Sequence, residues 1–329
     1  MNEMQLDVVV TRGDSVEAVH RVHAAAVEPS GRLVGRAREA AWVSHWRSCA
    51  KPFQVMPFAD AGGFDAVGWN DERVALSCAS HGGEPEHLAV AAAMLVSLGL
   101  GEADLACGPH EPLTARGAEL LRASGAAPTR LHNNCSGKHA AMLARAKTAG
   151  WPTAGYHRAE HEVQKGCLAS VSRWTGLAAD EIGRAVDGCG VVEYSLSLRA
   201  MATSYARLGQ AATDGDPGPS RVLGAMQTHP FLVGGTDRFD TILIEETDGR
   251  VISKVGAEGV HSAVCLEQGI GVAVKVEDGA ARAQYPALLR ALQLLDVLPA
   301  KLPSRLESVL RRPIVNTRGE VVGEIHPGN

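Results

Sequence analysis

Lysine is scarce in this chain. Of its 32 basic side chains only seven are lysines, so arginine is the default surface cation. Arginine stays protonated in proteins, whereas a lysine amine can lose its proton and then act as a base or bind a metal ion. A lysine in a chain that otherwise uses arginine is therefore a candidate functional residue.

Long apolar runs and clusters of basic residues are absent as well. No run approaches the roughly 18 apolar residues of a membrane-spanning helix. Residues 1–7 lack the basic and apolar regions of a signal peptide, so we expect a cytoplasmic protein. The net charge is −5, which together with the lack of a Lys/Arg cluster argues against a nucleic acid or a membrane surface as a partner.

Cysteines are few and their number is odd. Seven of them are scattered over 329 residues, without the dense pattern of a small secreted protein. In an intracellular chain, isolated cysteines are typical of reduced thiols, of a metal site or of catalysis. A disulfide framework is therefore not expected.

The order of predicted elements is strands, then helices, then strands again. Alternating and apolar runs between turn residues predict strands over Leu6–Val10, Val16–Val27, Trp42–Trp46, Thr241–Glu246, Arg250–Val255, His261–Leu266, Gly271–Val276 and a turn-containing tail over Pro313–Ile325. Helical spacing predicts helices over Pro52–Phe58, Pro85–Leu98, Arg116–Ala123, Gly137–Thr148, Ala159–Thr175, Ser195–Ala212 and Ala280–Leu295, with a loop over 213–219 and a hairpin turn at Asp248–Gly249.

Strands at both chain ends predict an α+β fold. An antiparallel sheet would form from about residues 1–47 and 238–329, and a helical portion of about 48–237 would be inserted between them. We treat the whole chain, 1–329, as a single functional unit. Pockets tend to form at boundaries between such portions, which draws attention to Ser48.

Ser48-Cys49-Ala50-Lys51 combines a nucleophile and a base in four residues. Residues three apart on a helix share a face, so the Lys51 amine could reach the Ser48 hydroxyl. Pro52 suits the first turn of a helix, which would place Ser48 between a strand and a helix, where backbone N–H groups can hold an oxyanion. A chance Ser-x-x-Lys is common, so the motif alone does not establish chemistry.

Four further stretches combine small residues with reactive side chains. Each also has a purely structural interpretation: the glycines are turn residues, Cys78 is a small buried hydrophobe, and Asn133-Asn134 caps the following helix. The stretches are Ser77-Cys78-Ala79-Ser80-His81-Gly82-Gly83-Glu84, Asn133-Asn134-Cys135-Ser136-Gly137-Lys138-His139, Asp187-Gly188-Cys189-Gly190-Val191 and Ser253-Lys254-Val255-Gly256-Ala257-Glu258-Gly259.

Taken in order with Ser48 and Lys51, these blocks resemble the L-asparaginase II family of the Rhizobium etli type, which has the fold of serine β-lactamases and glutaminases. The resemblance extends over almost the whole chain. It implies hydrolysis of L-asparagine to L-aspartate and ammonia, assembly as a homodimer, and an active site with two Ser–Lys pairs. Those pairs carry over onto Ser48 with Lys51 and onto Ser80 with Lys254.

The resemblance also implies a metal site. One Zn²⁺ would bind Cys135, Lys138 and Cys189, with Asp187 holding a metal-bound water and His139 nearby. Two sulfur ligands, a nitrogen and a water suit tetrahedral zinc. We expect this ion to position the substrate and to preserve local structure, because Ser48 and Lys51 already supply a nucleophile and a base.

Two other functions fit part of the pattern. A β-lactamase or penicillin-recognising esterase would also show Ser-x-x-Lys with a late Lys-x-Gly, here Lys254-Val255-Gly256. A zinc-binding protein without enzymatic activity would keep Cys135 and Cys189 but would have no use for Ser48. Assays with asparagine, glutamine and nitrocefin separate the three.

Overall fold

The computed structural model describes residues 2–328, and the chain divides into two compact units. The first, called the sheet unit here, comprises the residues up to Cys49, Leu196–Gly209 and the residues from Ser253 onward. The second, called the helical unit, comprises Ala50–Ser195 and Gln210–Ile252. No helix within residues 2–328 has the length and hydropathy needed to cross a membrane.

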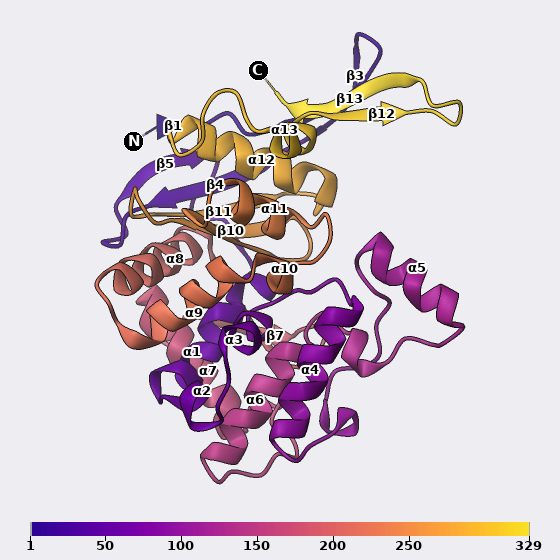
Figure 1. The fold of residues 1–329 in the computed structure, drawn as a ribbon. Helices are drawn as coiled ribbons and strands as arrows, with labels where there is room; N and C mark the ends of the chain where they lie inside the picture. The colour runs from indigo at the N-terminus through magenta and orange to yellow at the C-terminus, as the bar shows by residue number, and fades with distance from the viewer. Residues whose placement is uncertain (1, 329) are drawn as a thin grey trace. The chain divides into compact units, whose positions relative to one another are not determined.

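A six-stranded sheet forms the centre of the sheet unit (Figure 1). The pairs β4–β5, β4–β11 and β10–β11 are antiparallel, while β1 and β5 are parallel. The predicted α+β fold, with an antiparallel sheet made from both chain ends, is therefore confirmed. The strand order is β1-β5-β4-β11-β10-β9, with bounds β1 Asn2–Glu3, β4 Val22–Val27, β5 Leu33–Ala37, β9 Val251–Val255, β10 Val260–Cys265 and β11 Ile270–Val276.

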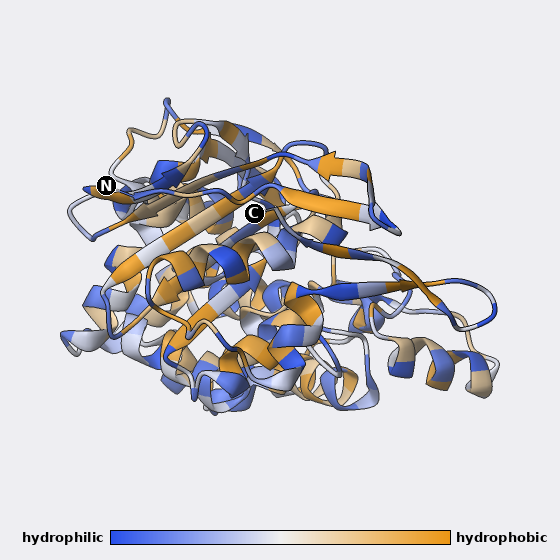
Figure 2. Cartoon of the chain, turned by 90° about the horizontal axis from the view of Figure 1, so that it is seen from above, coloured by the Kyte–Doolittle hydropathy of each residue, from blue (hydrophilic) through white to orange (hydrophobic). Residues whose placement is uncertain are grey.

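Helices cover both faces of this sheet. Strands such as β4 and β10 are therefore buried along their whole length. Figure 2 shows hydrophobic residues at consecutive positions along several strands. Helix α12 (Ala281–Leu294) contacts β10 and β11, and α8 (Leu198–Thr213) approaches β11 closely. A Cβ added at Gly271 would lie 1.9 Å from the Ala202 carbonyl oxygen, so only glycine permits this contact.

A second sheet of four strands combines two early strands with the last two strands of the chain. Its order is β12-β13-β2-β3, with β2 Val8–Arg12, β3 Ser15–His20, β12 Arg312–Val315 and β13 Val321–Pro327, and α13 (Ser304–Leu310) precedes it. The predicted turn in the tail separates β12 from β13. The prediction of one strand over Val16–Val27 is wrong, because the chain changes sheets at Arg21. There the Val22 N–H donates to Asp7 Oδ1 at 3.0 Å.

The helical unit is built around α1, which packs against α6, α7 and α9. Its two strands, β7 and β8, form an antiparallel hairpin. The bounds are α1 Lys51–Asp60, α2 Gly63–Ala66, α3 Asp71–Ser77, α4 Pro85–Ser97, α5 Ala115–Ser124, α6 Ser136–Thr148, α7 Glu162–Thr175, β7 Gly183–Val186, β8 Val192–Ser197, α9 Pro217–Thr228, α10 Pro230–Val233 and α11 Phe239–Glu246, with 3₁₀ turns at Glu102–Asp104 and Arg130–His132.

Three predictions fail in the helical unit. The hairpin at Asp248–Gly249 does not form, because a helix and not a strand precedes this turn. The strand predicted over Thr241–Glu246 is helix α11, whose residues Phe239 to Ile244 are all buried. A short, mostly buried run does not by its sequence pattern distinguish a strand from a helix. The loop predicted over 213–219 is wrong in its second half, because Pro217 begins α9 and Asp216 is its N-cap. Proline is favoured in the first turn of a helix, where its missing N–H costs nothing.

Candidate active site and metal site

Ser48 lies in a 3₁₀ turn, Arg47–Ala50, between strand β6 (Val43–His45) and helix α1. As predicted, it follows a strand and precedes a helix that has Pro52 in its first turn. The residue before it, Arg47, has φ of +54°, a left-handed conformation that is unusual for a residue with a side chain. Such strained backbone is often found at functional sites.

Within the sheet unit, Cys49 ties the Ser48 turn to strand β9 beside Lys254. The Cys49 thiol donates to the Lys254 carbonyl oxygen at 3.0 Å, and Tyr205 Oη donates to the Cys49 carbonyl at 2.8 Å. A Cβ at Gly256 would lie 3.0 Å from Cys49 Sγ, so glycine allows this close approach. Lys254 is fully buried and donates to the Val255 carbonyl at 2.9 Å. The structure thus brings two of the predicted blocks together.

Within the helical unit, Lys51 joins two other predicted blocks. Its side chain is fully buried at the start of α1. The amine donates to Ser80 Oγ at 3.0 Å and to the Asn134 carbonyl at 3.3 Å, and also to the Ala79 carbonyl. Ser80 is itself buried, with 2% of its surface exposed. A buried amine in contact with a hydroxyl is an arrangement that can transfer a proton.

The stretch after Ser80 is held by His81. The Gly83 N–H donates to His81 Nδ1 at 3.1 Å, so the opposite nitrogen, Nε2, carries the proton and donates to Ser136 Oγ at 2.9 Å. Ser136 in turn donates to the Leu131 carbonyl. Burial lowers the pKa of His81 well below its usual value, and the ring therefore stays neutral. His81 connects the Ser80 block to the Cys135 block.

Glu84 completes this stretch as a buried carboxylate. Its side chain has no exposed surface and accepts hydrogen bonds from the Thr236 N–H and the Thr236 hydroxyl, both at 2.7 Å, and from Arg116. Burial alone would raise the pKa of Glu84, but the bonds from Arg116 and Thr236 lower it below its usual value. Sequence reasoning assigned no role to His81 or Glu84, although a glutamate before Pro85 and an apolar helical run could have indicated a helix cap.

The predicted metal ligands lie together. The ligand atoms of Cys135, Asp187 and Cys189 are all within 4.8 Å of one another and buried. Lys138 Nζ lies 3.1 Å from Cys189 Sγ and 4.0 Å from Asp187 Oδ2. Cys135 caps α6 and Lys138 is in its first turn, while Asp187 and Cys189 lie in the turn between β7 and β8. Two distant parts of the chain therefore form this cluster.

Charge in the cluster is unevenly divided between the two thiols. The hydrogen bond from Cys135, together with the nearby Lys138 ammonium, lowers the pKa of Cys189 to about 6. The same bond and burial raise the pKa of Cys135 to about 12. Burial alone would lower the pKa of Lys138, but Cys189, Cys135 and Asp187 raise it. The cluster therefore favours a thiolate at Cys189, which is the form that binds a metal ion.

His139 lies beside the cluster with one nitrogen bonded. Tyr156 Oη accepts from the Ala106 N–H at 2.9 Å and bonds to His139 Nδ1 at 2.6 Å. His139 Nε2 is buried and has no hydrogen-bond partner within residues 2–328. Burial, followed by the charge of Lys138, lowers the pKa of His139 to about 3. Tyr156, which sequence reasoning missed, therefore orients this ring.

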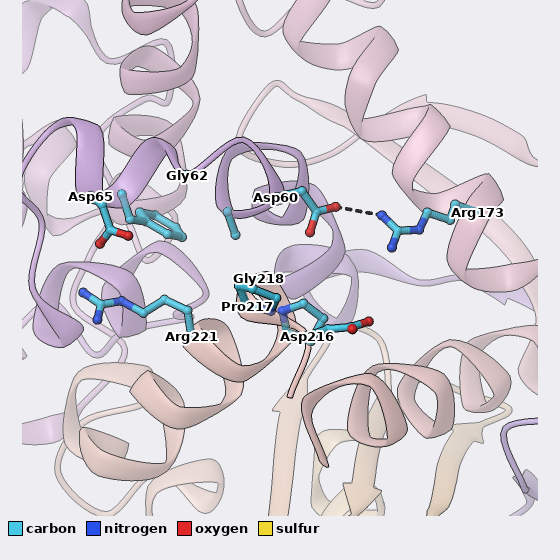
Figure 3. Close-up of a pocket in the computed structure, with 11 residues that line it drawn as sticks. Asp60, Gly62, Asp65, Arg173, Asp216, Pro217, Gly218 and Arg221 are labelled. Carbon is cyan, nitrogen blue, oxygen red and sulfur yellow. Dashed lines mark hydrogen bonds and ion pairs between the residues drawn. The ribbon is translucent and has the colours of Figure 1, made fainter. Parts of the chain in front are cut away.

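Figure 3 shows a separate cavity of about 420 Å³ in the helical unit. Asp60, Asp65 and Asp216 line it with Arg173 and Arg221, and Asp60 forms an ion pair with Arg173 at 2.8 Å. None of the predicted site residues lines this cavity. It is therefore distinct from the groups around Lys51 and Cys135.

Comparison with known proteins identifies the family. No curated protein sequence matches the chain. Among solved structures, Mglu in its native form is 15% identical with a TM-score of 0.46, and the match covers 84% of this chain and 64% of the length of Mglu. A β-lactamase from Mycobacterium bovis is 12% identical with a TM-score of 0.35, over 84% of this chain and 96% of its own. The model of the L-asparaginase II family matches residues 8–327. The chain therefore belongs to the L-asparaginase II family, the amidohydrolase family that its sequence motifs predicted.

Proposed function

We propose that this protein is an L-asparaginase that hydrolyses L-asparagine to L-aspartate and ammonia through a serine acyl-enzyme. The family match over nearly the whole chain supports the activity. The observation that carries the mechanism is the buried contact of 3.0 Å between Lys51 Nζ and Ser80 Oγ. A lysine that contacts a hydroxyl in a water-poor site can accept and return a proton if it enters the cycle neutral.

Ser48 is the proposed nucleophile. Its oxygen attacks the side-chain amide carbon of asparagine, and its proton passes to Lys51. The protonated lysine, with Ser80 as a relay, then supplies the proton with which ammonia leaves. Water attacks the resulting ester, a base takes its proton, and aspartate leaves with Ser48 restored. Lys254 is the proposed partner of Ser80. For Ser48 and Lys254, which belong to the sheet unit, these roles come from the family resemblance.

The Cys135 cluster is the proposed zinc site. Ligands of a tetrahedral zinc ion lie about 3.5 Å apart. Lys138 Nζ lies 3.1 Å from Cys189 Sγ, and the ligand atoms of Cys135, Asp187 and Cys189 all lie within 4.8 Å of one another, which suits such an ion. Cys135, Lys138 and Cys189 would hold it, and Asp187 would orient a water. Bound zinc would supply a fixed positive charge that attracts a carboxylate of the substrate. Its binding requires Lys138 to lose a proton, which a metal ion favours.

The proposal is tested by two assays in parallel. One measures ammonia release from L-asparagine and from L-glutamine, and the other measures hydrolysis of nitrocefin. We expect rapid release from asparagine, much slower release from glutamine, and none from the Ser48→Ala variant. Hydrolysis of nitrocefin without ammonia release would identify a β-lactamase instead. Zinc binding without either activity would identify a protein with a structural or regulatory zinc site. The homodimer and the cytoplasmic location stay predictions.

A further inference from the structure

A second cavity of the helical unit lies along strand β7, which Figure 1 labels. It has a volume of about 910 Å³ and is called the β7 cavity here. Its charged lining consists of Arg158 and Arg184 with Glu160, and His157 also lines it. The remaining wall is mostly apolar or small: Ala106, Ala159, Ile182, Ala185, Val186, Gly190 and Val192. A large cavity with a few charged groups is typical of a binding site for a small molecule.

The arginines of the β7 cavity have no carboxylate partner. Among residues 2–328, no ion pair involves Arg158, Arg184 or Glu160. His157 Nδ1 is buried and also lacks a hydrogen-bond partner among these residues. The cavity in Figure 3 differs, because its Arg173 pairs with Asp60 and its Arg221 with Asp71 at 3.2 Å. The β7 cavity is therefore lined by two arginines that have no carboxylate partner in residues 2–328.

These charges define the chemistry of the ligand. A guanidinium binds a carboxylate through two parallel hydrogen bonds, so two unpaired arginines favour a molecule with two carboxylates. Glu160 adds one negative charge, which matches an ammonium group. Two carboxylates and one ammonium are the charged groups of L-aspartate. Asparagine has one carboxylate fewer and leaves one arginine without a partner.

We propose that the β7 cavity is a binding site for L-aspartate, through which the product inhibits the enzyme. This inference rests on the proposed function for the identity of the product. The wall of the cavity includes Gly190, which follows Cys189, and Ala106, whose N–H donates to Tyr156. The Gly190 N–H donates to the Asp187 carbonyl at 2.8 Å and closes the turn that carries Asp187 and Cys189. A ligand against this wall contacts the turn from outside the metal cluster.

The test measures binding by isothermal titration calorimetry. The probes are L-aspartate, succinate, which lacks the ammonium group, and L-asparagine titrated into the inactive Ser48→Ala protein. We expect the double variant Arg158→Gln/Arg184→Gln to weaken aspartate and succinate binding at least tenfold. Glu160→Gln should weaken aspartate only. Arg173→Gln, in the cavity of Figure 3, is the matched control and should change neither. Aspartate binding that is unchanged in the double variant overturns the inference.

Inhibition kinetics and the molecular mass of the protein in solution distinguish a failure of this inference from a failure of the proposed function. If asparaginase activity is present, aspartate should inhibit by a mixed pattern in wild type, and inhibition should weaken in the double variant with kcat unchanged. If inhibition is purely competitive and is the same in the double variant, the inference is overturned, but the proposed asparaginase function is retained. Arginine-dependent aspartate binding without any asparaginase activity supports the site and rejects the function. A change of molecular mass in the double variant with unchanged binding shows a contact between copies and also overturns the inference.

Discussion

Lys51 Nζ lies 3.0 Å from Ser80 Oγ, and both side chains are buried. Sequence reasoning had assigned Lys51 to Ser48 and Ser80 to Lys254, as two separate pairs. The contact shows that one lysine reaches the serine of the other pair. The proton relay through Ser80 is therefore proposed to begin at Lys51.

Lys51→Arg should reduce kcat about a hundredfold or more, because arginine keeps the charge but does not give up its proton. The measurement is ammonia release under saturating asparagine. Arginine is larger than lysine at a fully buried position, so Lys51→Met is made in parallel to show that loss of activity does not require a bulkier side chain. Lys147→Arg, at an exposed position of α6, is the control and should remain fully active. Near-normal kcat in Lys51→Arg would show that Lys51 acts only as a charge.

Ser80→Ala should lower kcat with little change in KM, because the relay is used in proton transfer and not in holding the substrate. The loss should be about a hundredfold, as for other groups that transfer protons. Ser77→Ala removes another buried hydroxyl of the same stretch, one that donates to the Arg73 carbonyl at 2.8 Å. It controls for packing and should keep its activity. Equal losses in the two variants would argue against a relay.

Glu84→Gln should destabilise the fold by about 1.5 to 3 kcal/mol at pH 7, the usual range for hydrogen bonds to a charged group. The lowered pKa of Glu84 means that its contribution is present above the unfolded pKa of about 4.3 and is lost as pH falls through the folded pKa. The difference in unfolding free energy between wild type and variant should therefore shrink below about pH 4. Urea unfolding at several pH values measures this.

Glu86→Gln is the matched control for Glu84. Glu86 pairs with the same Arg116 at 2.7 Å, but its side chain is 47% exposed. Exposed ion pairs contribute little, so this variant should lose less than about 1 kcal/mol. A pH-independent loss in Glu84→Gln would show that packing, and not charge, accounts for its effect.

Zinc removal should raise KM more than it lowers kcat, because the ion is proposed to position substrate. Elemental analysis should find one zinc per chain in protein purified without chelator, and less in Cys135→Ser. Cys167→Ala, which removes a buried thiol on α7 outside the cluster, should retain the metal. Complete loss of kcat in folded, metal-free enzyme would contradict the assigned role.

Glutamine should be a much poorer substrate than asparagine. A site that fixes the α-amino and α-carboxylate groups of the substrate determines how far the amide carbon lies from the nucleophile. The extra methylene of glutamine displaces this carbon. Discrimination by a single methylene is usually about 10- to 200-fold in kcat/KM. Comparable values for the two amides would indicate a general glutaminase-asparaginase.

Most of the fold was predictable from the sequence, because apolar runs bounded by turn residues indicate strands, and apolar residues at helical spacing indicate helices. Thr241–Glu246 was mispredicted because β-branched Thr241 and Ile242 favour a strand locally, whereas packing on all sides selects a helix. Hairpin β7–β8 was missed because Gly183–Val186 is short and mostly exposed. Tertiary packing, which local sequence does not encode, decided these cases.

The site was predicted less completely than the fold. Resemblance to a family placed Cys135, Lys138 and Cys189 in one cluster, and the structure brings them together with Asp187. The roles of His81 and Tyr156 were missed, because a histidine or tyrosine that orients another residue has no spacing pattern in the sequence. Only the three-dimensional contacts with Ser136 and His139 show them.

The central claim is that Ser48 forms a covalent acyl-enzyme with the substrate. The most direct measurement is rapid acid quenching of the enzyme during turnover of asparagine, followed by digestion and mass spectrometry of the peptides. We predict an aspartyl adduct on the peptide that contains Ser48, at a position that fragmentation assigns to its hydroxyl. An adduct on Ser80 would contradict the assigned nucleophile, and steady ammonia release from the Ser48→Ala variant would contradict the mechanism.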